Sequence, residues 1–197
     1  MKRTTRFKIM NITFWLFIIF LAIDLYKAYK SPVVFLLPVV LIVGINIVTR
    51  LAWKKFYEGR KLIQQRNYEG ALEKYHSFLN DITAKPFIRY LMYITFRSYT
   101  EKLTAVIYNN IASCYINLSQ LKKAKEAIDQ SLQEDDLYAV PYYNLAIIGI
   151  IEKKPKSAKK HLEKANALGF KTISFDAFKT YIEKVYNKSS EEQNPSS

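Results

Sequence analysis

Residues 108–127 read YNNIASCYINLSQLKKAKEA, and residues 142–162 read YYNLAIIGIIEKKPKSAKKHL. When the second stretch is moved back by 34 residues, the aligned positions agree in chemical kind. The matched pairs are Tyr108 with Tyr142, Asn110 with Asn144, Ala112 with Ala146, Ala124 with Ala158, and Ile128 with Leu162. A period of this length, with small residues at fixed points, predicts stacked pairs of antiparallel helices.

An earlier stretch follows the same pattern. Residues 56–79 read FYEGRKLIQQRNYEGALEKYHSFL and place a glycine, Gly59, where the later units have Ala112 and Ala146. We expect these three small residues where the first helix of each pair approaches the second. The returning helices carry their own small residues at matching positions, which are Ala71, Ala124 and Ala158.

This pattern resembles the tetratricopeptide repeat (TPR) family over residues 53 to about 170. The resemblance implies an all-α fold in which about three helix pairs form a short α-solenoid. It also implies a protein that holds partners and rarely catalyses. The third unit departs from the family pattern, because it has Gly149 where an aromatic residue is usual and Pro155 in its turn. A proline is acceptable at the first position of a helix, where its missing N–H would be unpaired anyway.

Two apolar runs precede the repeats, at Ile9–Ile23 and Pro32–Val48. They have 15 and 17 residues, at the short end of what crosses a bilayer core. We therefore expect residues 1–52 to form a membrane anchor of two transmembrane helices. A cleaved signal peptide is the alternative for the first run, but no clear A-x-A cleavage site follows it. With this anchor, the chain is similar to membrane-anchored, bacterial-type TPR proteins.

Basic residues near the membrane ends predict the orientation of this hairpin. Lys and Arg are more frequent before the first run and after the second than in the short connection. We expect a multi-pass protein of the inner or plasma membrane with both termini in the cytoplasm. Trp15, Tyr26 and Trp53 are placed to anchor the helices at the membrane interface.

The repeats are interrupted after the first unit. The first and second units are 53 residues apart, so 19 residues are inserted, and they fall within residues 84–103. One interpretation is that they lengthen the helix pair by adding turns that pack on neighbouring helices. A second is an amphipathic element on the bilayer, whose basic residues contact anionic lipid. A third is a patch that binds a partner.

The C-terminal region contains one more predicted helix. Ile173–Asn187 has Phe175, Phe178, Ile182 and Val185 at helical spacing, as expected of a helix that caps the last repeat. The predicted domains are therefore the anchor at residues 1–52, the TPR-like domain at residues 53–187, and a disordered tail at residues 188–197.

Candidate partner-binding residues follow from the resemblance, because TPR ligands usually lie in the groove lined by the first helices. Carried onto this sequence, the candidates are Arg60, Gln64, Asn109, Ser113, Asn117, Tyr143 and Ile147. The Lys, Asn and Arg set that clamps the two carboxylates of a chaperone's acidic tail is missing, so we do not expect that ligand. The third unit presents an apolar stripe, which either holds a hydrophobic peptide or is covered by the insert.

The net charge, the cysteine content and the remaining motifs do not indicate a catalytic or metal site. The net charge of +13 permits nucleic acid or anionic lipid as a partner, although nucleic acid is not favoured. Cys114 is the single cysteine, which excludes an intrachain disulfide, and we expect it to be a small buried side chain. No catalytic constellation or metal-ligand spacing is present, so we expect no enzyme activity, no cofactor and no metal.

The sequence therefore predicts a membrane-anchored TPR adaptor that binds a protein or peptide at the cytoplasmic membrane surface. Two alternatives remain. One is a subunit of a membrane secretion or polysaccharide-export assembly, in which the hairpin itself contacts other proteins. The other is a basic surface that binds anionic lipid or nucleic acid.

Overall fold

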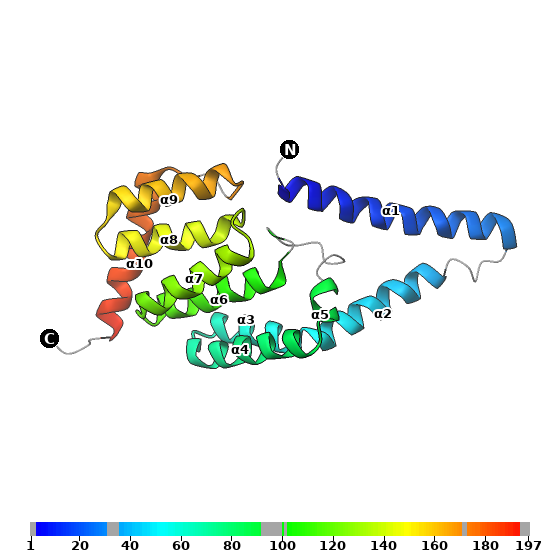
Figure 1. Ribbon diagram of the computed structural model, residues 1–197, viewed down its shortest axis with the longest axis horizontal. Coiled ribbons are helices and arrows are strands. Elements are labelled where there is room, and N and C mark those ends of the chain that lie inside the picture. The colour runs from blue at the N-terminus through cyan, green and yellow to red at the C-terminus, as the bar shows by residue number, and fades with distance from the viewer. Residues whose placement is uncertain (1–2, 31–35, 92–99, 101, 171–172, 194–197) are drawn as a thin grey trace. The chain divides into compact units, whose positions relative to one another are not determined.

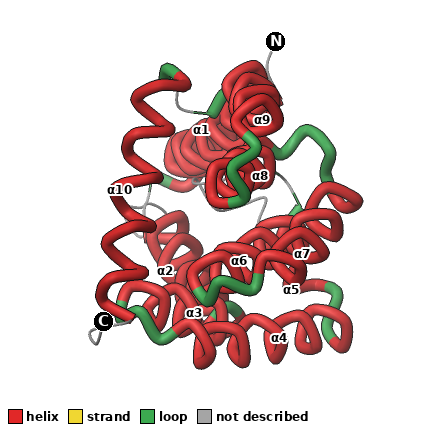
Figure 2. Tube along the Cα trace, turned by 90° about the vertical axis from the view of Figure 1, so that its left-hand side faces the viewer, coloured by secondary structure: helices red, strands yellow, loops and turns green. Residues whose placement is uncertain are grey.

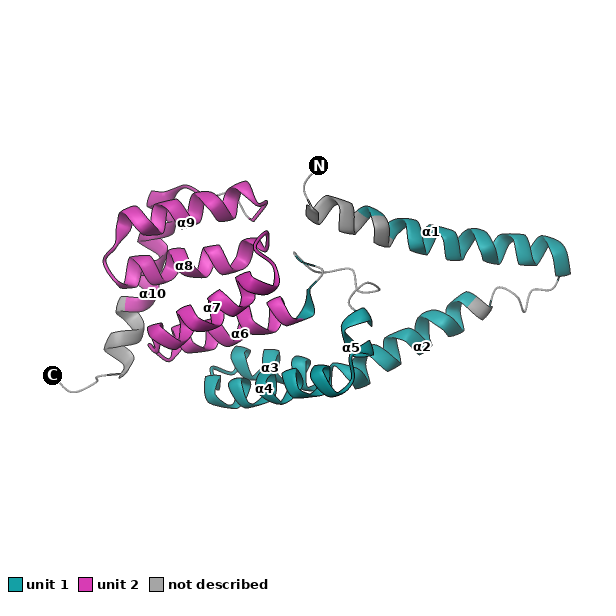
Figure 3. Cartoon of the chain, viewed as in Figure 1, with its two compact units in different colours: residues 1–103 teal, residues 104–197 magenta. Residues whose placement is uncertain are grey.

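The computed structural model describes residues 3–30, 36–91, 100, 102–170 and 173–193, and all regular structure among them is helical (Figures 1 and 2). The chain forms two compact units, residues 1–103 and 104–197 (Figure 3). We describe each unit separately. The first repeat pair belongs to the same unit as the N-terminal helices, although the sequence predicts a division after residue 52.

The two N-terminal helices, α1 (Arg3–Tyr29) and α2 (Leu36–Ala52), expose apolar side chains along their length. Phe20 is 61% exposed and Val40 is 66% exposed. Within the described residues, one helix is both long and apolar enough to cross a membrane, over Ile12–Tyr29. The apolar part of α2 is shorter, at Pro38–Ala52. The second crossing therefore stays a prediction.

Helix α2 leads into α3 (Lys54–Gln64) through the single residue Trp53. Helical hydrogen bonds continue across it, because Trp53 N–H donates to the Thr49 carbonyl at 2.9 Å and Tyr57 N–H donates to the Trp53 carbonyl at 3.0 Å. Trp53 is buried, and its indole lies edge-on to Phe56. The prediction that Trp53 is an interfacial anchor is therefore wrong, because its ring packs inside the first unit.

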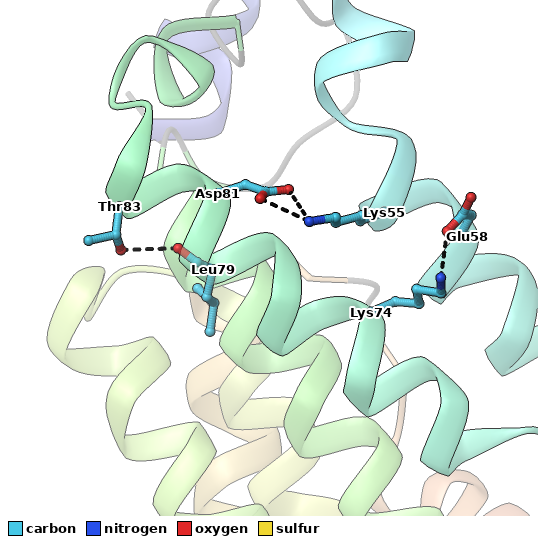
Figure 4. Close-up of polar contacts among 6 residues, drawn as sticks. All are labelled: Lys55, Glu58, Lys74, Leu79, Asp81 and Thr83. Carbon is cyan, nitrogen blue, oxygen red and sulfur yellow. Dashed lines mark hydrogen bonds and ion pairs between the residues drawn. The ribbon is translucent and has the colours of Figure 1, made fainter.

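Helices α3 and α4 (Tyr68–Ala84) form the first repeat pair. Asn67 caps α4 by accepting the Gly70 N–H at 2.9 Å. A Cβ added at Gly59 would lie 2.9 Å from the Tyr75 ring, so a glycine allows the two helices to approach closely, as the sequence predicts. Two ion pairs join the exposed edges of these helices, Lys55 with Asp81 at 2.7 Å and Lys74 with Glu58 at 3.1 Å (Figure 4).

The described start of the insert forms a separate short turn of helix. Helix α4 ends at Ala84, where Lys85 takes a non-helical conformation and Pro86 follows. A short helix, α5 (Phe87–Tyr90), comes next. Helix α4 stops here because proline disfavours the helical conformation in the residue before it. The turn of α5, with Ile88 buried, fits the interpretation that the insert adds turns packed on neighbouring helices. Residues 92–99 and 101 of the insert lie outside the described residues.

The second unit contains two repeat pairs and one further helix. The pairs are α6 (Leu103–Asn117) with α7 (Leu121–Glu134), and α8 (Ala139–Ile151) with α9 (Pro155–Ala167). Ser131 joins the first pair by donating its hydroxyl to the Ala105 carbonyl at 2.7 Å. A Cβ at Gly149 would lie 2.9 Å from the Cβ of Ala158, which explains the glycine at this position. Pro155 begins α9, as predicted.

One turn recurs in all three pairs. Arg66, Ser119 and Lys153 have φ of 59°, 58° and 57°, and they are separated by the same 53 and 34 residues as the sequence units. The residue after each of them donates its N–H to a carbonyl five residues earlier, at 2.9, 2.9 and 2.7 Å. This left-handed residue ends a helix and satisfies its last carbonyls. The repeat is therefore confirmed in backbone conformation as well as in sequence.

The C-terminal helix α10 (Phe175–Gln193) packs against α8, as predicted for a capping helix. Phe178 and Ile182 are buried in a cluster with Ala146, Ile150, Ala158 and Leu162. The helix continues to Gln193, whereas the sequence predicts an end at residue 187 and a disordered tail after it. Val185 is 40% exposed.

Candidate partner-binding site

The first unit offers Arg60 and Gln64 on α3. Both side chains are exposed, and their spacing of four residues places them on one face of the helix. The guanidinium of Arg60 donates hydrogen bonds and carries a positive charge, while the Gln64 amide both donates and accepts. This pair suits recognition of a carbonyl or carboxylate, which is the kind of group that a peptide presents.

Asn109 is not available to a partner. It is 4% exposed, and its Oδ1 accepts a hydrogen bond from Nδ2 of Asn144 at 2.9 Å. The bond joins α6 to α8 inside the second unit. Asn109 was expected to line the groove, and the structure corrects this. A buried amide must be hydrogen-bonded, and Asn144 supplies its partner. The sequence gives little sign of this pairing, because Asn144 lies 35 residues away and aligns with Asn110.

Asn117 and Ser113 lie one turn apart at the end of α6. Asn117 is exposed, and its Nδ2 donates to the backbone carbonyl of Ser113 at 2.8 Å. This bond uses one N–H of the amide, and the amide oxygen is an acceptor that a ligand's donor could use. Ser113 is half-buried. Of the three polar residues predicted on this face, Asn117 is therefore the most accessible.

Tyr143 and Ile147 lie beneath the C-terminal helix. The Tyr143 ring is 4.6 Å from the Phe170 ring and 5.2 Å from the Phe178 ring, measured between centroids. Ile147 packs against the same cluster as Phe178. Burial raises the pKa of the Tyr143 hydroxyl, and the nearby Tyr181 raises it further. In the described part of the second unit, α10 packs on the apolar stripe of the third pair.

A charged cluster joins the second and third pairs at their turns. Glu152, at the end of α8, accepts hydrogen bonds from Lys125 of α7 and from Lys154, the latter at 2.9 Å. These two hydrogen bonds lower the pKa of Glu152 below its usual range, and the bond from Lys125 has the larger effect. The cluster therefore holds its charge at neutral pH and fixes the turn rather than offering a binding group.

Cys114 is a buried thiol on α6. Its side chain is fully buried, as predicted, and burial raises the pKa of its thiol to about 12. A buried thiol in apolar surroundings is typical of a structural cysteine. In the part of the chain that the structure describes, no group of three or more His, Cys, Asp or Glu residues could hold a metal ion.

Comparison with known proteins agrees with this architecture. Residues 105–136, which form most of α6 and α7, match the sequence profile of the tetratricopeptide repeat. No curated protein matches the chain. The first TPR domain of the human RPAP3 protein, solved by NMR, is 18% identical with a TM-score of 0.50, covering 72% of this chain and 97% of that chain. At this identity, the likeness shows the fold alone.

Two further solved structures are similar at lower TM-scores. The first TPR of Spaghetti (RPAP3), bound to the HSP90 peptide SRMEEVD, is 19% identical with a TM-score of 0.48, covering 69% of this chain and 93% of that chain. The TPR2B domain of yeast Sti1, in complex with pHsp70, is 18% identical with a TM-score of 0.46, covering 72% of this chain and 97% of that chain. The profile match at residues 105–136 identifies α6 and α7 as a tetratricopeptide repeat, and the likeness to the RPAP3 domain, at a TM-score of 0.50, supports an all-helical TPR-like fold.

Proposed function

We propose that this protein is a membrane-anchored adaptor, in which α1 and α2 hold the chain in a bilayer and the repeats bind a protein or peptide at the cytoplasmic surface. The observation that supports this proposal is a contrast between two parts of the chain. Helices α1 and α2 expose large apolar side chains, whereas the helices of the three repeat pairs bury most of theirs. Apolar side chains exposed along a whole helix suit lipid as their surroundings.

Each unit offers its own candidate partner surface: exposed Arg60 and Gln64 in the first unit, and exposed Asn117 with half-buried Ser113 beside it in the second. Repeats of this kind present extended surfaces for partners. Asn109 is not part of the proposed site, because its side-chain amide is hydrogen-bonded to Asn144. Tyr143 and Ile147 are partly buried against the cluster that contains Phe178 of α10, so their full exposure to a partner would require α10 to move. An enzymatic role has no support from the described side chains.

Photo-crosslinking in intact cells tests this proposal. A photoreactive residue at Asn117 is expected to capture a protein partner. The matched control is Gln130, which is exposed on α7, the second helix of the same pair. Capture by both positions alike, or by neither, would contradict binding through the first helices.

Exchange of residues 1–52 for an unrelated hairpin separates the adaptor from a subunit of a membrane assembly. An adaptor needs only an anchor that concentrates its partner at the membrane, so its captured partner stays the same. Loss of that partner indicates that α1 and α2 make specific protein contacts. A chain recovered from the aqueous fraction, without detergent, would contradict the membrane anchor itself.

A further inference from the structure

We propose that α5 is an interfacial anchor, with the side chains of Phe87 and Tyr90 in the headgroup region of the bilayer and those of Lys85 and Arg89 near lipid phosphates. The inference rests on the proposed crossing of the membrane by α2. It assigns a role to the described start of the insert, which is contact with membrane lipid.

The position of α5 along the first unit is the first argument. The indole Nε1 of Trp53 donates a hydrogen bond to the carbonyl of Ile88 at 3.3 Å. Trp53 is the residue that joins α2 to α3, so this bond holds α5 beside the end of the apolar helix (Figure 1). An element fixed at this level lies at the membrane surface whenever α2 spans the bilayer.

The change in exposed side chains at the same level is the second argument. Leu51, which is 71% exposed, is the last large apolar residue on the surface of α2. Arg50 and Lys54 are exposed on either side of it, and the following helix exposes Arg60 and Lys61. A change from apolar to basic side chains marks the boundary between the hydrocarbon core and the headgroups.

The side chains of α5 itself are the third argument. Ile88 is buried in the unit, whereas Phe87 is 55% exposed and Tyr90 is 67% exposed. Aromatic side chains are favoured at the membrane interface. Lys85 and Arg89, exposed beside them, complement the negative charge of lipid phosphates. The short helix thus presents exposed aromatic side chains to lipid, whereas the aromatic ring of Trp53 is buried.

Depth-dependent fluorescence quenching tests the proposal on the full chain reconstituted in liposomes. Single variants Phe87→Cys and Tyr90→Cys each carry one fluorophore and keep the other aromatic residue. Cys114 needs no replacement, because its thiol is fully buried and has a raised pKa, which protect it from the label. Gln64→Cys, exposed at the far end of α3, is the aqueous control, and Val40→Cys is the control for the hydrocarbon core.

We expect nitroxide lipids labelled at the headgroup to quench positions 87 and 90, while nitroxides deep in the acyl chains quench position 40. Addition of anionic phosphatidylglycerol should increase the headgroup quenching at position 90, and Arg89→Gln should remove that increase. If position 40 is quenched but positions 87 and 90 behave like position 64, the interfacial anchor is overturned and the membrane anchor stands. If position 40 is not quenched by any lipid, the crossing of α2 fails and the role of α5 fails with it.

Discussion

Asn144 of α8 donates its Nδ2 hydrogen to Oδ1 of Asn109 on α6 at 2.9 Å, and both side chains are buried. This amide pair fixes the register of two neighbouring first helices in the second unit. It also converts a predicted binding residue into a structural one. Removing one partner leaves the other buried without the bond that compensated its desolvation.

Asn109→Ala is therefore expected to lower the free energy of unfolding by about 1–3 kcal/mol, the usual cost of leaving a buried polar group unsatisfied. Chemical denaturation of the purified full chain, in detergent, measures this change. Asn117→Ala is the control, since its amide is exposed, and its effect should stay within about 0.5 kcal/mol. If Asn109→Ala leaves stability unchanged but abolishes crosslinking from position 117, Asn109 belongs to the binding surface after all.

The close approach of α8 and α9 at Gly149 gives a second prediction. Gly149→Ala places a Cβ 2.9 Å from the Cβ of Ala158 and 3.0 Å from its backbone nitrogen, so the two helices must separate. Overpacking of this kind costs about 1–3 kcal/mol. Gly44→Ala is the matched control, because no atom lies within 4 Å of its added Cβ. Thermal unfolding should show a clear drop for Gly149→Ala alone.

The left-handed turn at Lys153 gives a third prediction. A non-glycine residue in this conformation costs about 1–2 kcal/mol, and glycine removes that cost while adding entropy to the unfolded chain. With φ of 57° at Lys153, Lys153→Gly should stabilise the protein by a net of about 0.5–1 kcal/mol. Lys153→Ala removes the same charge without relieving the backbone, so a rise in melting temperature for alanine as well would refute the conformational explanation.

The dependence of stability on pH around Glu152 gives a fourth prediction. Because Lys125 and Lys154 lower its pKa below the usual 4.5, the ionised carboxylate stabilises the folded state above that value. This contribution is lost as pH falls from 4.5 through the lowered pKa. Glu152→Gln should therefore lower the free energy of unfolding at pH 7, by well under about 1 kcal/mol given solvent screening, and the melting temperature with it. The difference from the native chain should disappear in acid, whereas Glu163→Gln, exposed on α9, should show little difference at either pH.

The cap formed by α10 gives a fifth prediction. Phe178 is fully buried against the third repeat pair, so Phe178→Ala should cost about 3–5 kcal/mol, as is typical of a buried aromatic residue. Loosening of α10 should also speed proteolysis within residues 175–193. Tyr181, one turn along and 58% exposed, is the control, and Tyr181→Ala should leave both measurements nearly unchanged. Equal effects from the two substitutions would contradict the assignment of Phe178 as the anchor of the cap.

Much of the fold follows from the sequence because it depends on local spacing. Small residues at Gly59, Ala112 and Ala146 mark the helix contacts, and the turns at Arg66, Ser119 and Lys153 keep the same intervals in the backbone. Apolar runs before residue 53 predict exposed apolar helices, which the structure contains. These features need only the periodicity of a helix and the chemistry of its turns.

The candidate site was less accessible to sequence reasoning, because it depends on which side chains meet across helices. Only the tertiary structure pairs Asn109 with Asn144, buries Trp53 beneath α5, and places Tyr143 under α10. A residue's place on a helix face can be read from its spacing. Whether that face meets solvent or another element is decided by packing between residues far apart in the chain, and a single sequence does not record those contacts.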